Sequence, residues 1–163
     1  MSIILIGFMG AGKSSVSKLL DDKYMDLDTQ IERQIQMPIS RFFELFGEAE
    51  FRQIESEIFQ SAVLMNFTIA TGGGIVESKI NRKILENQNQ VVYLSADFET
   101  LLSRIRHDNE NVRPLAEDLA VLKTRFDRRK KYYESLSNLT IDTSNLTVEE
   151  IVAAIREKFP KEK

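Results

Sequence analysis

Four short segments rich in apolar residues recur along the chain, and polar residues or glycines bound each of them. These segments cover residues 3–6, 24–28, 67–71 and 91–94. Apolar runs of this length are typical of strands that are covered on both faces, as the strands of a parallel sheet are. We therefore predict a strand at each of these four positions.

The segments between these runs place apolar residues at steps of three and four, the spacing of a helix with one buried face. A short helix is predicted over residues 40–46, and Gly47 is expected to interrupt it before a longer helix begins. The apolar stripe of that longer helix consists of Phe51, Ile54, Ile58, Ala62 and Met65. Further helices are predicted over residues 12–20, 31–37, 79–86, 98–106, 115–135 and 148–159.

Strands and helices alternate from one end of the chain to the other. This order predicts an α/β fold with a parallel sheet and helices on both of its faces. The 163 residues suffice for one sizeable core and are few for two ordinary domains. We therefore expect a single domain, and we find no internal repeat or linker in the sequence.

Composition narrows the possible partners and compartments. The 22 Lys and Arg residues against 25 Asp and Glu give a net charge of −3, so no overall field attracts nucleic acid or anionic lipid. The chain has no Cys, which excludes disulfides and thiolate metal sites and suits the reducing cytoplasm. No apolar run reaches the length of a membrane span, and the first one stops at Gly7, so we expect no signal peptide.

Residues 7–14, with the sequence GFMGAGKS, match the phosphate-binding pattern G-x-x-x-x-G-K-[ST] at every fixed position. The match lies directly after a predicted strand and directly before a predicted helix, which is the context that the pattern requires. Its glycines let backbone N–H groups point at phosphate oxygens, and the helix N-terminus favours anions. In such a loop Lys13 reaches the β- and γ-phosphates, and the Ser14 hydroxyl holds Mg²⁺.

The remaining sequence narrows the class of nucleotide-binding protein. The N-K-x-D and D-x-x-G motifs of GTPases are absent, and the chain is too short for the inserted domains of motors or transporters. A small-molecule kinase is the economical interpretation. The polar, Asn-rich segment 108–113 has the composition of a loop that closes over a ligand. A kinase for another metabolite, such as gluconate, and a catalytically silent ATP-binding module both remain as alternatives.

Five motifs follow one another in a pattern that resembles shikimate kinases. They are GFMGAGKSS from Gly7, DLD at 26–28, EFRQIE at 50–55, TGGG at 71–74 and VRPL at 112–115. The resemblance implies a three-layer α/β/α P-loop fold with a mostly five-stranded parallel sheet, formed by one domain over residues 1–163. It further implies a substrate-binding region over about 28–60 and a mobile lid over about 107–117. The implied reaction transfers the γ-phosphate of ATP to the 3-hydroxyl of shikimate, with Mg²⁺ as cofactor. We expect a monomer, because no large exposed apolar stripe remains once the core faces are assigned.

The resemblance also assigns roles at the phosphate end of the site. It implies that Lys13 and Arg113 stabilise the transferring phosphoryl group, and that Arg113 arrives when the lid closes. It places Arg106 near the adenine, and Ser14 and Asp26 on the Mg²⁺ side. The nucleotide-binding residues are then Gly10, Ala11, Gly12, Lys13, Ser14, Ser15, Arg106 and Arg113.

Shikimate carries one carboxylate and three ring hydroxyls, so its site needs fixed cations together with hydroxyl acceptors or backbone groups. The resemblance assigns the carboxylate to Arg52 and Arg129. It places Asp28 and the glycines of the turn Gly72, Gly73 and Gly74 against the hydroxyls. Asp28 is the third catalytic residue, which orients the attacking hydroxyl or accepts its proton.

Each of these acceptor-side groups also has a purely structural interpretation. Arg52 can pair with Glu48 or with Glu55, and the resemblance suggests that Glu55 supports it. Asp28 can cap a helix that starts near Thr29. The triple glycine can be a simple turn, although its entropic cost is better explained by a site.

Two features depart from the family pattern. The segment from Lys13 to Asp26 is a few residues shorter than usual, so the first helix must be brief or its exit loop nearly absent. Lys131 stands where the family has proline, and the neighbouring Arg128 raises the possibility that it, rather than Arg129, reaches the substrate carboxylate.

Two other basic features have less consequence for function. The run of residues 128–131 resembles a nucleic-acid patch, but neighbours on a helix point in different directions, so we interpret it as a surface helix. The single histidine, His107, lies in a polar stretch, and we expect it to be solvated.

Overall fold

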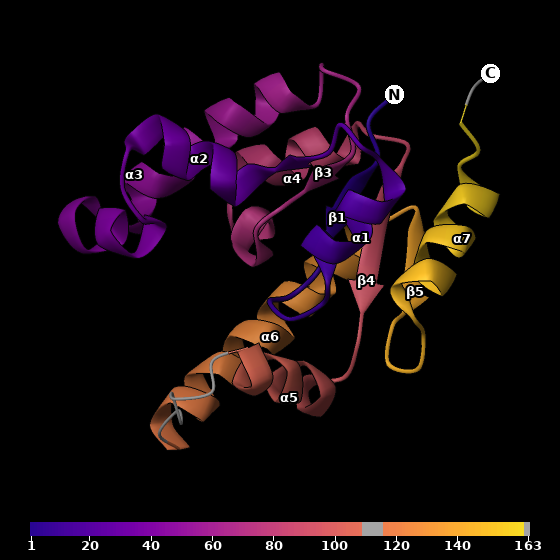
Figure 1. Ribbon diagram of the computed structural model, residues 1–163. Helices are drawn as coiled ribbons and strands as arrows, with labels where there is room; N and C mark the ends of the chain where they lie inside the picture. Colours follow the sequence, from indigo (N-terminus) through magenta and orange to yellow (C-terminus); the bar gives the residue numbers. More distant parts are fainter. Residues whose placement is uncertain (109–115, 162–163) are drawn as a thin grey trace.

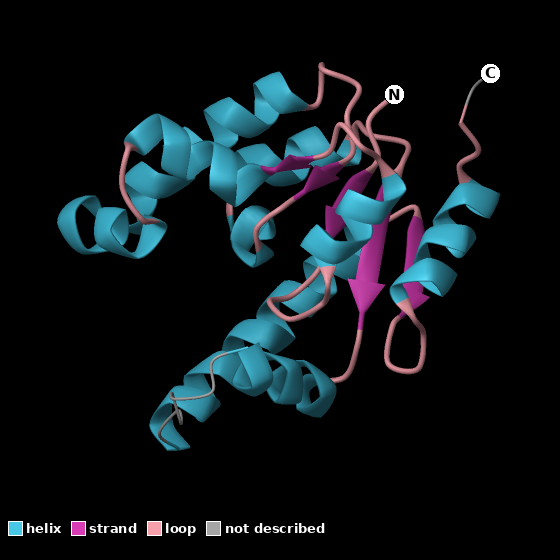
Figure 2. Cartoon of the chain, in the orientation of Figure 1, coloured by secondary structure: helices cyan, strands magenta, loops and turns pink. Residues whose placement is uncertain are grey.

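The computed structural model of the chain describes residues 1–108 and 116–161. Within them, five strands form one parallel sheet in the order β2-β3-β1-β4-β5 (Figure 2). The strands are β1 (Ile4–Ile6), β2 (Met25–Asp26), β3 (Ile69–Ala70), β4 (Val91–Ser95) and β5 (Leu139–Asp142). Leu5 of the central strand pairs with Ala70 on one side and Val92 on the other. The α/β fold with a five-stranded parallel sheet is confirmed.

Helices cover both faces of this sheet (Figure 1). On one face α1 (Lys13–Leu20) packs against α7 (Val148–Lys158), and on the other α4 (Lys79–Glu86) packs against α6 (Ala116–Leu136). The helices α2 (Leu27–Ile35) and α3 (Ile39–Ala62) pair with each other and extend away from the sheet. The 3₁₀ helix η1 (Gly73–Glu77) leads from β3 to α4, and α5 (Phe98–Asp108) follows β4.

The edge strands differ most from the sequence prediction. The second strand is shorter than predicted and ends at Asp26, so Asp28 lies in the first turn of α2 and not in a strand. The fifth strand was implied by the resemblance but not located by the apolar pattern. Its four residues include exposed Thr140 and Asp142, because an edge strand is not covered on all sides.

Gly47 interrupts α3 as predicted. Its φ of 81° and ψ of 173° lie outside the helical region and in the range that favours glycine, so two helical segments meet there at a kink. The buried stripe of the second segment includes Phe51 and Ala62, as expected. The assignment of Met65 to this stripe was wrong, because α3 ends at Ala62 and the Met65 side chain is exposed.

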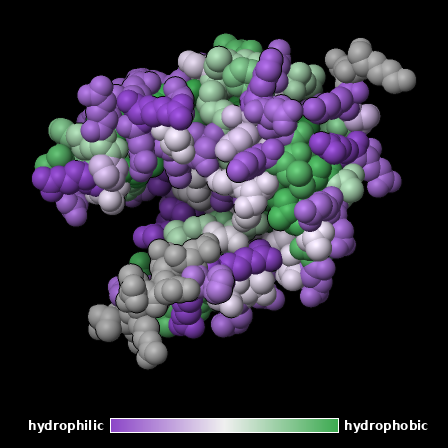
Figure 3. Space-filling model, viewed as in Figure 1, coloured by the Kyte–Doolittle hydropathy of each residue, from purple (hydrophilic) through white to green (hydrophobic). Residues whose placement is uncertain are grey.

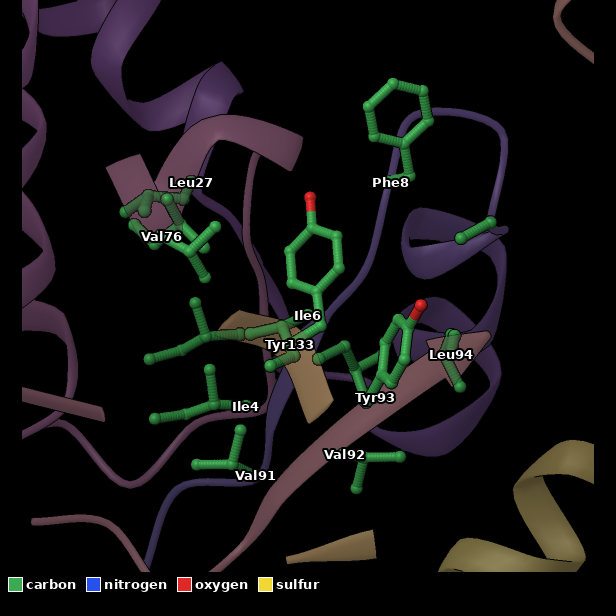
Figure 4. Close-up of a cluster of buried hydrophobic side chains, with 14 of the residues drawn as sticks. Ile4, Ile6, Phe8, Leu27, Val76, Val91, Val92, Tyr93, Leu94 and Tyr133 are labelled. Atoms are coloured by element: carbon green, nitrogen blue, oxygen red, sulfur yellow. The ribbon is translucent and has the colours of Figure 1, made fainter. Parts of the chain in front are cut away.

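The core lies between the sheet and its two helical layers. Figure 4 shows side chains of β1 and β4 beside Tyr133, which reaches the sheet from α6. The Tyr133 ring packs on Tyr93 of β4 with ring centroids 5.1 Å apart. This contact fixes α6, which carries Arg129, against the sheet. Among the helices of residues 1–108 and 116–161, none combines the length and the apolarity needed to span a membrane.

Replacement of Phe59 by Ala should lower the free energy of unfolding by about 3–5 kcal/mol, because the side chain of Phe59 is fully buried and its loss leaves a cavity. Urea denaturation at neutral pH measures the change. Leu64→Ala, which truncates an apolar side chain that is 78% exposed just past the end of α3, serves as the control and should change it by less than about 0.5 kcal/mol. Equal effects of the two substitutions would contradict the described packing.

Candidate active site

The phosphate-binding loop joins the carboxyl end of β1 to the start of α1. Gly10 and Gly12 have φ values of 81° and 89°, which only glycine adopts readily. The buried Lys13 side chain turns back into the loop, and its Nζ donates to the carbonyl oxygens of Gly7 (2.5 Å) and Phe8 (3.0 Å). The loop is therefore already curled around its lysine.

Burial sets the protonation of Lys13. Desolvation lowers its pKa to about 8, and the nearby Arg129 acts in the same direction. The carboxylates of Asp28 and Asp26 oppose this decrease. The ammonium group is thus less stable than an ordinary lysine's, and an incoming anion would stabilise it.

Asp26 connects the phosphate loop to the next helix. One carboxylate oxygen accepts a hydrogen bond from the Ser14 hydroxyl (2.7 Å), and the other accepts one from the backbone N–H of Thr29 (3.2 Å). Asp26 is therefore the N-cap of α2. The alternative that Asp28 caps this helix was wrong, which leaves the Asp28 side chain available for other contacts.

Asp28 is half-buried beside the first glycine of the triple-glycine turn. A Cβ added at Gly72 would lie 2.6 Å from its Oδ1, so a side chain there would displace the carboxylate. Burial, together with the charge of Asp26, raises the pKa of Asp28, and Lys13 partly opposes this increase. This carboxylate can therefore hold or accept a proton more readily than an ordinary aspartate.

Arg52 lies on the second segment of α3 and is held by acidic partners. Its Nη1 donates to both oxygens of the buried Glu55, at 3.0 and 3.1 Å, and its Nε donates to Glu48 at 3.3 Å. Asn81 of α4 also donates to Glu55 (3.1 Å). Burial holds the pKa of Glu55 above its ordinary value, and Arg52 and the Asn81 hydrogen bond partly oppose this increase. The predicted support of Arg52 by Glu55 is thus present as a hydrogen-bonded pair.

Arg129 approaches the site from α6. Its side chain is buried, whereas that of Arg128 is 52% exposed and turns outward to Glu77. Tyr133, one turn later on the same face, donates a hydrogen bond to the carbonyl oxygen of Gly73. Arg129, and not Arg128, therefore faces the glycine turn, although Lys131 stands where the family has proline.

The three glycines bring these charged groups together. A Cβ at Gly73 would lie 3.5 Å from Nη1 of Arg129, and a Cβ at Gly74 would lie 2.8 Å from Cζ of Arg52. With Asp28 at Gly72, one carboxylate and two guanidinium groups thus approach three successive backbone positions. Figure 3 shows the surface hollowed between the α2–α3 region and the α5–α6 region, with hydrophilic residues along the opening.

The family model described as "Shikimate kinase" matches residues 9–160. The chain belongs to the shikimate kinase family.

Individual relatives agree over almost the whole chain. The "Shikimate kinase" of Lactococcus lactis subsp. cremoris (strain MG1363) is 54% identical over 159 residues, which cover 98% of both chains. That of Enterococcus faecalis is 42% identical, covering 97% of this chain and 98% of the relative. The solved shikimate kinase of Acinetobacter baumannii in complex with shikimate has a TM-score of 0.84 and 29% identity, covering 98% of this chain and 95% of the other. That of Bacteroides thetaiotaomicron has a TM-score of 0.86 and 25% identity, with 99% of each chain covered.

Most of the other residues predicted to bind the nucleotide in this shikimate kinase family member lie in or next to the phosphate loop. Gly10, Ala11, Gly12, Ser14 and Ser15 all lie in the loop or in the first turn of α1. The helix α1 has only 8 residues, as the short segment before Asp26 required. Arg106 and His107 are exposed near the end of α5, and Arg113 lies outside the described residues, as does most of the predicted lid.

Sequence reasoning missed Arg104, which ties the phosphate loop to the end of the sheet. Its Nη1 donates to the carbonyl oxygen of Gly10 (3.3 Å) and to the Thr143 hydroxyl (3.1 Å), and its Nη2 donates to the Thr143 carbonyl oxygen (3.0 Å). Thr143 itself hydrogen-bonds the carbonyl oxygen of Ser95 at the end of β4. No motif marks Arg104, because its partners are distant in sequence and only the fold brings them near it.

Replacement of Asp28 by Asn should increase the free energy of unfolding at pH 7. A raised pKa means that folding penalises the charged carboxylate, and this penalty is complete above the raised value and vanishes below the ordinary value of 3.8. The gain should therefore shrink as the pH falls toward 3.8, which urea denaturation at a series of pH values measures. The control is Asp22→Asn at an exposed position, expected to change stability by less than about 0.5 kcal/mol. A less stable Asp28→Asn protein at pH 7 would refute this account.

Proposed function

We propose that the chain transfers the γ-phosphate of ATP to the 3-hydroxyl of shikimate. The observation that carries this proposal is the convergence of Asp28, Arg52 and Arg129 on the three glycines that follow β3. A small ring with one carboxylate and several hydroxyls matches two guanidinium groups, one carboxylate and exposed backbone. The phosphate loop passes beside this cluster, since the backbone nitrogen of Met9 lies 3.3 Å from a Cβ placed on Gly73.

On the acceptor side, we assign the shikimate carboxylate to Arg52 and Arg129. Guanidinium groups bind carboxylates through paired, charge-assisted hydrogen bonds. Asp28 and the Gly72–Gly74 backbone would take the ring hydroxyls. Because the pKa of Asp28 is raised by burial and by Asp26, it is suited to orient the 3-hydroxyl and to accept its proton as the phosphoryl group transfers.

On the phosphate side, we assign the polyphosphate to the backbone N–H groups of residues 10–15 and to Lys13. Lys13 Nζ now donates to two loop carbonyl oxygens, and phosphate oxygens would replace those acceptors. Phosphoryl transfer depends mainly on positioning and on stabilisation of charge, which these groups supply. We also assign Arg106 to the adenine and Arg113 to the transferring phosphoryl group, as the family resemblance implies.

The pair Ser14 and Asp26 fits a Mg²⁺ site. Mg²⁺ prefers oxygen ligands and retains several waters, so it uses few protein groups. The Ser14 hydroxyl and an Asp26 oxygen lie 2.7 Å apart beside the phosphate loop, which gives two hard oxygen donors at the required place. When bound there, the ion would neutralise charge on the β- and γ-phosphates.

We further infer that the protein works as one domain and as a monomer in the cytoplasm. A single cluster of buried apolar side chains extends from Phe42 in α3 to Ile155 in α7, which supports one cooperative unit. The lack of Cys fits the reducing conditions of that compartment.

The decisive assay measures ADP production from Mg·ATP with shikimate, quinate or gluconate as acceptor. We expect turnover with shikimate far above that with the other two acids. Lys13→Ala should lower the rate by about 100-fold or more, because the transferring charge loses its cation. Nucleotide binding without shikimate-dependent ADP production would sink the proposal.

Replacement of Arg52 by Gln tests the carboxylate assignment. Loss of one charge-assisted pair should raise the KM for shikimate by about 30- to 100-fold, and the KM for ATP should not change. The matched control is Arg41→Gln, which removes an exposed arginine paired with Glu44 on the same helix and should leave both KM values unaltered. If the ATP KM rose as much as the shikimate KM, Arg52 would serve the fold rather than the substrate.

A further inference from the structure

Glu77, the last residue of η1, lies between two neighbouring arginines of α6. Its Oε1 accepts from Nε of Arg128 (3.1 Å), and its Oε2 accepts from Nη2 of Arg128 (2.5 Å). Nε of Arg129 lies 3.5 Å from the same Oε2, on the buried side. The Glu77 carboxylate thus pairs with the half-exposed Arg128 through both of its oxygens and with the buried Arg129 through one of them.

The ion pair with Glu77 is the contact that the structure shows for the Nε side of Arg129. Its Nε is buried and has no hydrogen-bond partner within residues 1–108 and 116–161. Its guanidinium lies 5.9 Å from the ring centre of Phe8, a distance at which the attraction is weak. Tyr133, one turn further along α6, also interacts with the Arg129 guanidinium, but Glu77 is the carboxylate that contacts its Nε.

Glu77 itself is firmly placed. Nη1 of Arg82 donates to the backbone carbonyl oxygens of Val76 (2.7 Å) and Glu77 (3.1 Å), and the Arg82 guanidinium stacks over the Tyr132 ring of α6 at 4.4 Å. Partial burial raises the pKa of Glu77, but the hydrogen bonds from Arg128 and the charges of both arginines hold it below its ordinary value. The carboxylate stays charged at neutral pH.

We propose that Glu77 is a positioning residue for the substrate carboxylate: it draws the Nε side of Arg129 toward η1, so that the other guanidinium nitrogens face the glycine turn. This inference rests on the proposed function. Arg128 has the complementary role of binding Glu77 in two places and offsetting its charge. The positive charge of Arg129 is then left available for the acid group of shikimate.

Replacement of Glu77 by Gln tests this role. We expect the KM for shikimate to rise about tenfold, because a misdirected guanidinium loses part of its pairing with the substrate, while kcat and the KM for ATP stay within about twofold. Arg128→Gln should change the shikimate KM in the same direction and by less. Glu134→Gln, which removes an acid paired with Lys130 on the exposed face of α6, is the matched control and should change nothing.

The methyl ester of shikimate separates positioning from general damage. The ester has no carboxylate for Arg129, so the ratio of its KM between Glu77→Gln and the parent should be close to one. An unchanged or lower KM for shikimate in Glu77→Gln, or an equal loss with acid and ester, overturns the proposal. If Glu77→Gln does not fold, Arg128→Gln decides by the same comparison. A parent protein that does not phosphorylate shikimate would instead refute the proposed function.

Discussion

The close approach of charged side chains to a bare stretch of backbone is the constraint on which the acceptor site depends. Asp28, Arg52 and Arg129 come from three different helices. Asp28 and Arg52 lie where a side chain on Gly72 or Gly74 would have to be, and Arg129 lies within van der Waals contact of a Cβ on Gly73. A side chain at Gly72 or Gly74 would displace the Asp28 carboxylate or the Arg52 guanidinium. The rest of the architecture, including the outward extension of α2 and α3, serves to deliver these groups to the end of β3.

The positive charges of the two arginines near the glycine turn are each balanced by a glutamate. Each of the two site arginines has a glutamate behind it, Glu55 for Arg52 and Glu77 for Arg129. Taking ions out of water is costly unless they are paired and hydrogen-bonded, so these pairs allow the guanidinium groups to be buried without an occupied site. The pairs differ in strength: Arg52 donates two hydrogen bonds to Glu55, whereas Arg129 has only an ion pair.

Much of the fold and of the candidate site was predictable from the sequence, and the features that were missed have physical causes. The phosphate loop and the central strands follow from local signals, because a glycine pattern and a short apolar run each encode one conformation. The edge strand β5 has no such signal, since half of its residues meet solvent. The choice between Asp26 and Asp28 as helix cap depends on where the strand ends, which neighbouring strands decide. Arg104 and Glu77 act through contacts 39 and 51 residues away in sequence, which no local pattern contains.

The double use of Asp26 has a mechanical consequence. One of its oxygens is bound to the first turn of α1 through Ser14, and the other is bound to the first turn of α2 through Thr29. Two residues further on, α2 presents Asp28 to the acceptor site. A single side chain therefore ties the phosphate loop to α2, and a displacement of the loop at Ser14 would act on the helix that carries Asp28, the carboxylate that we propose faces the reacting hydroxyl.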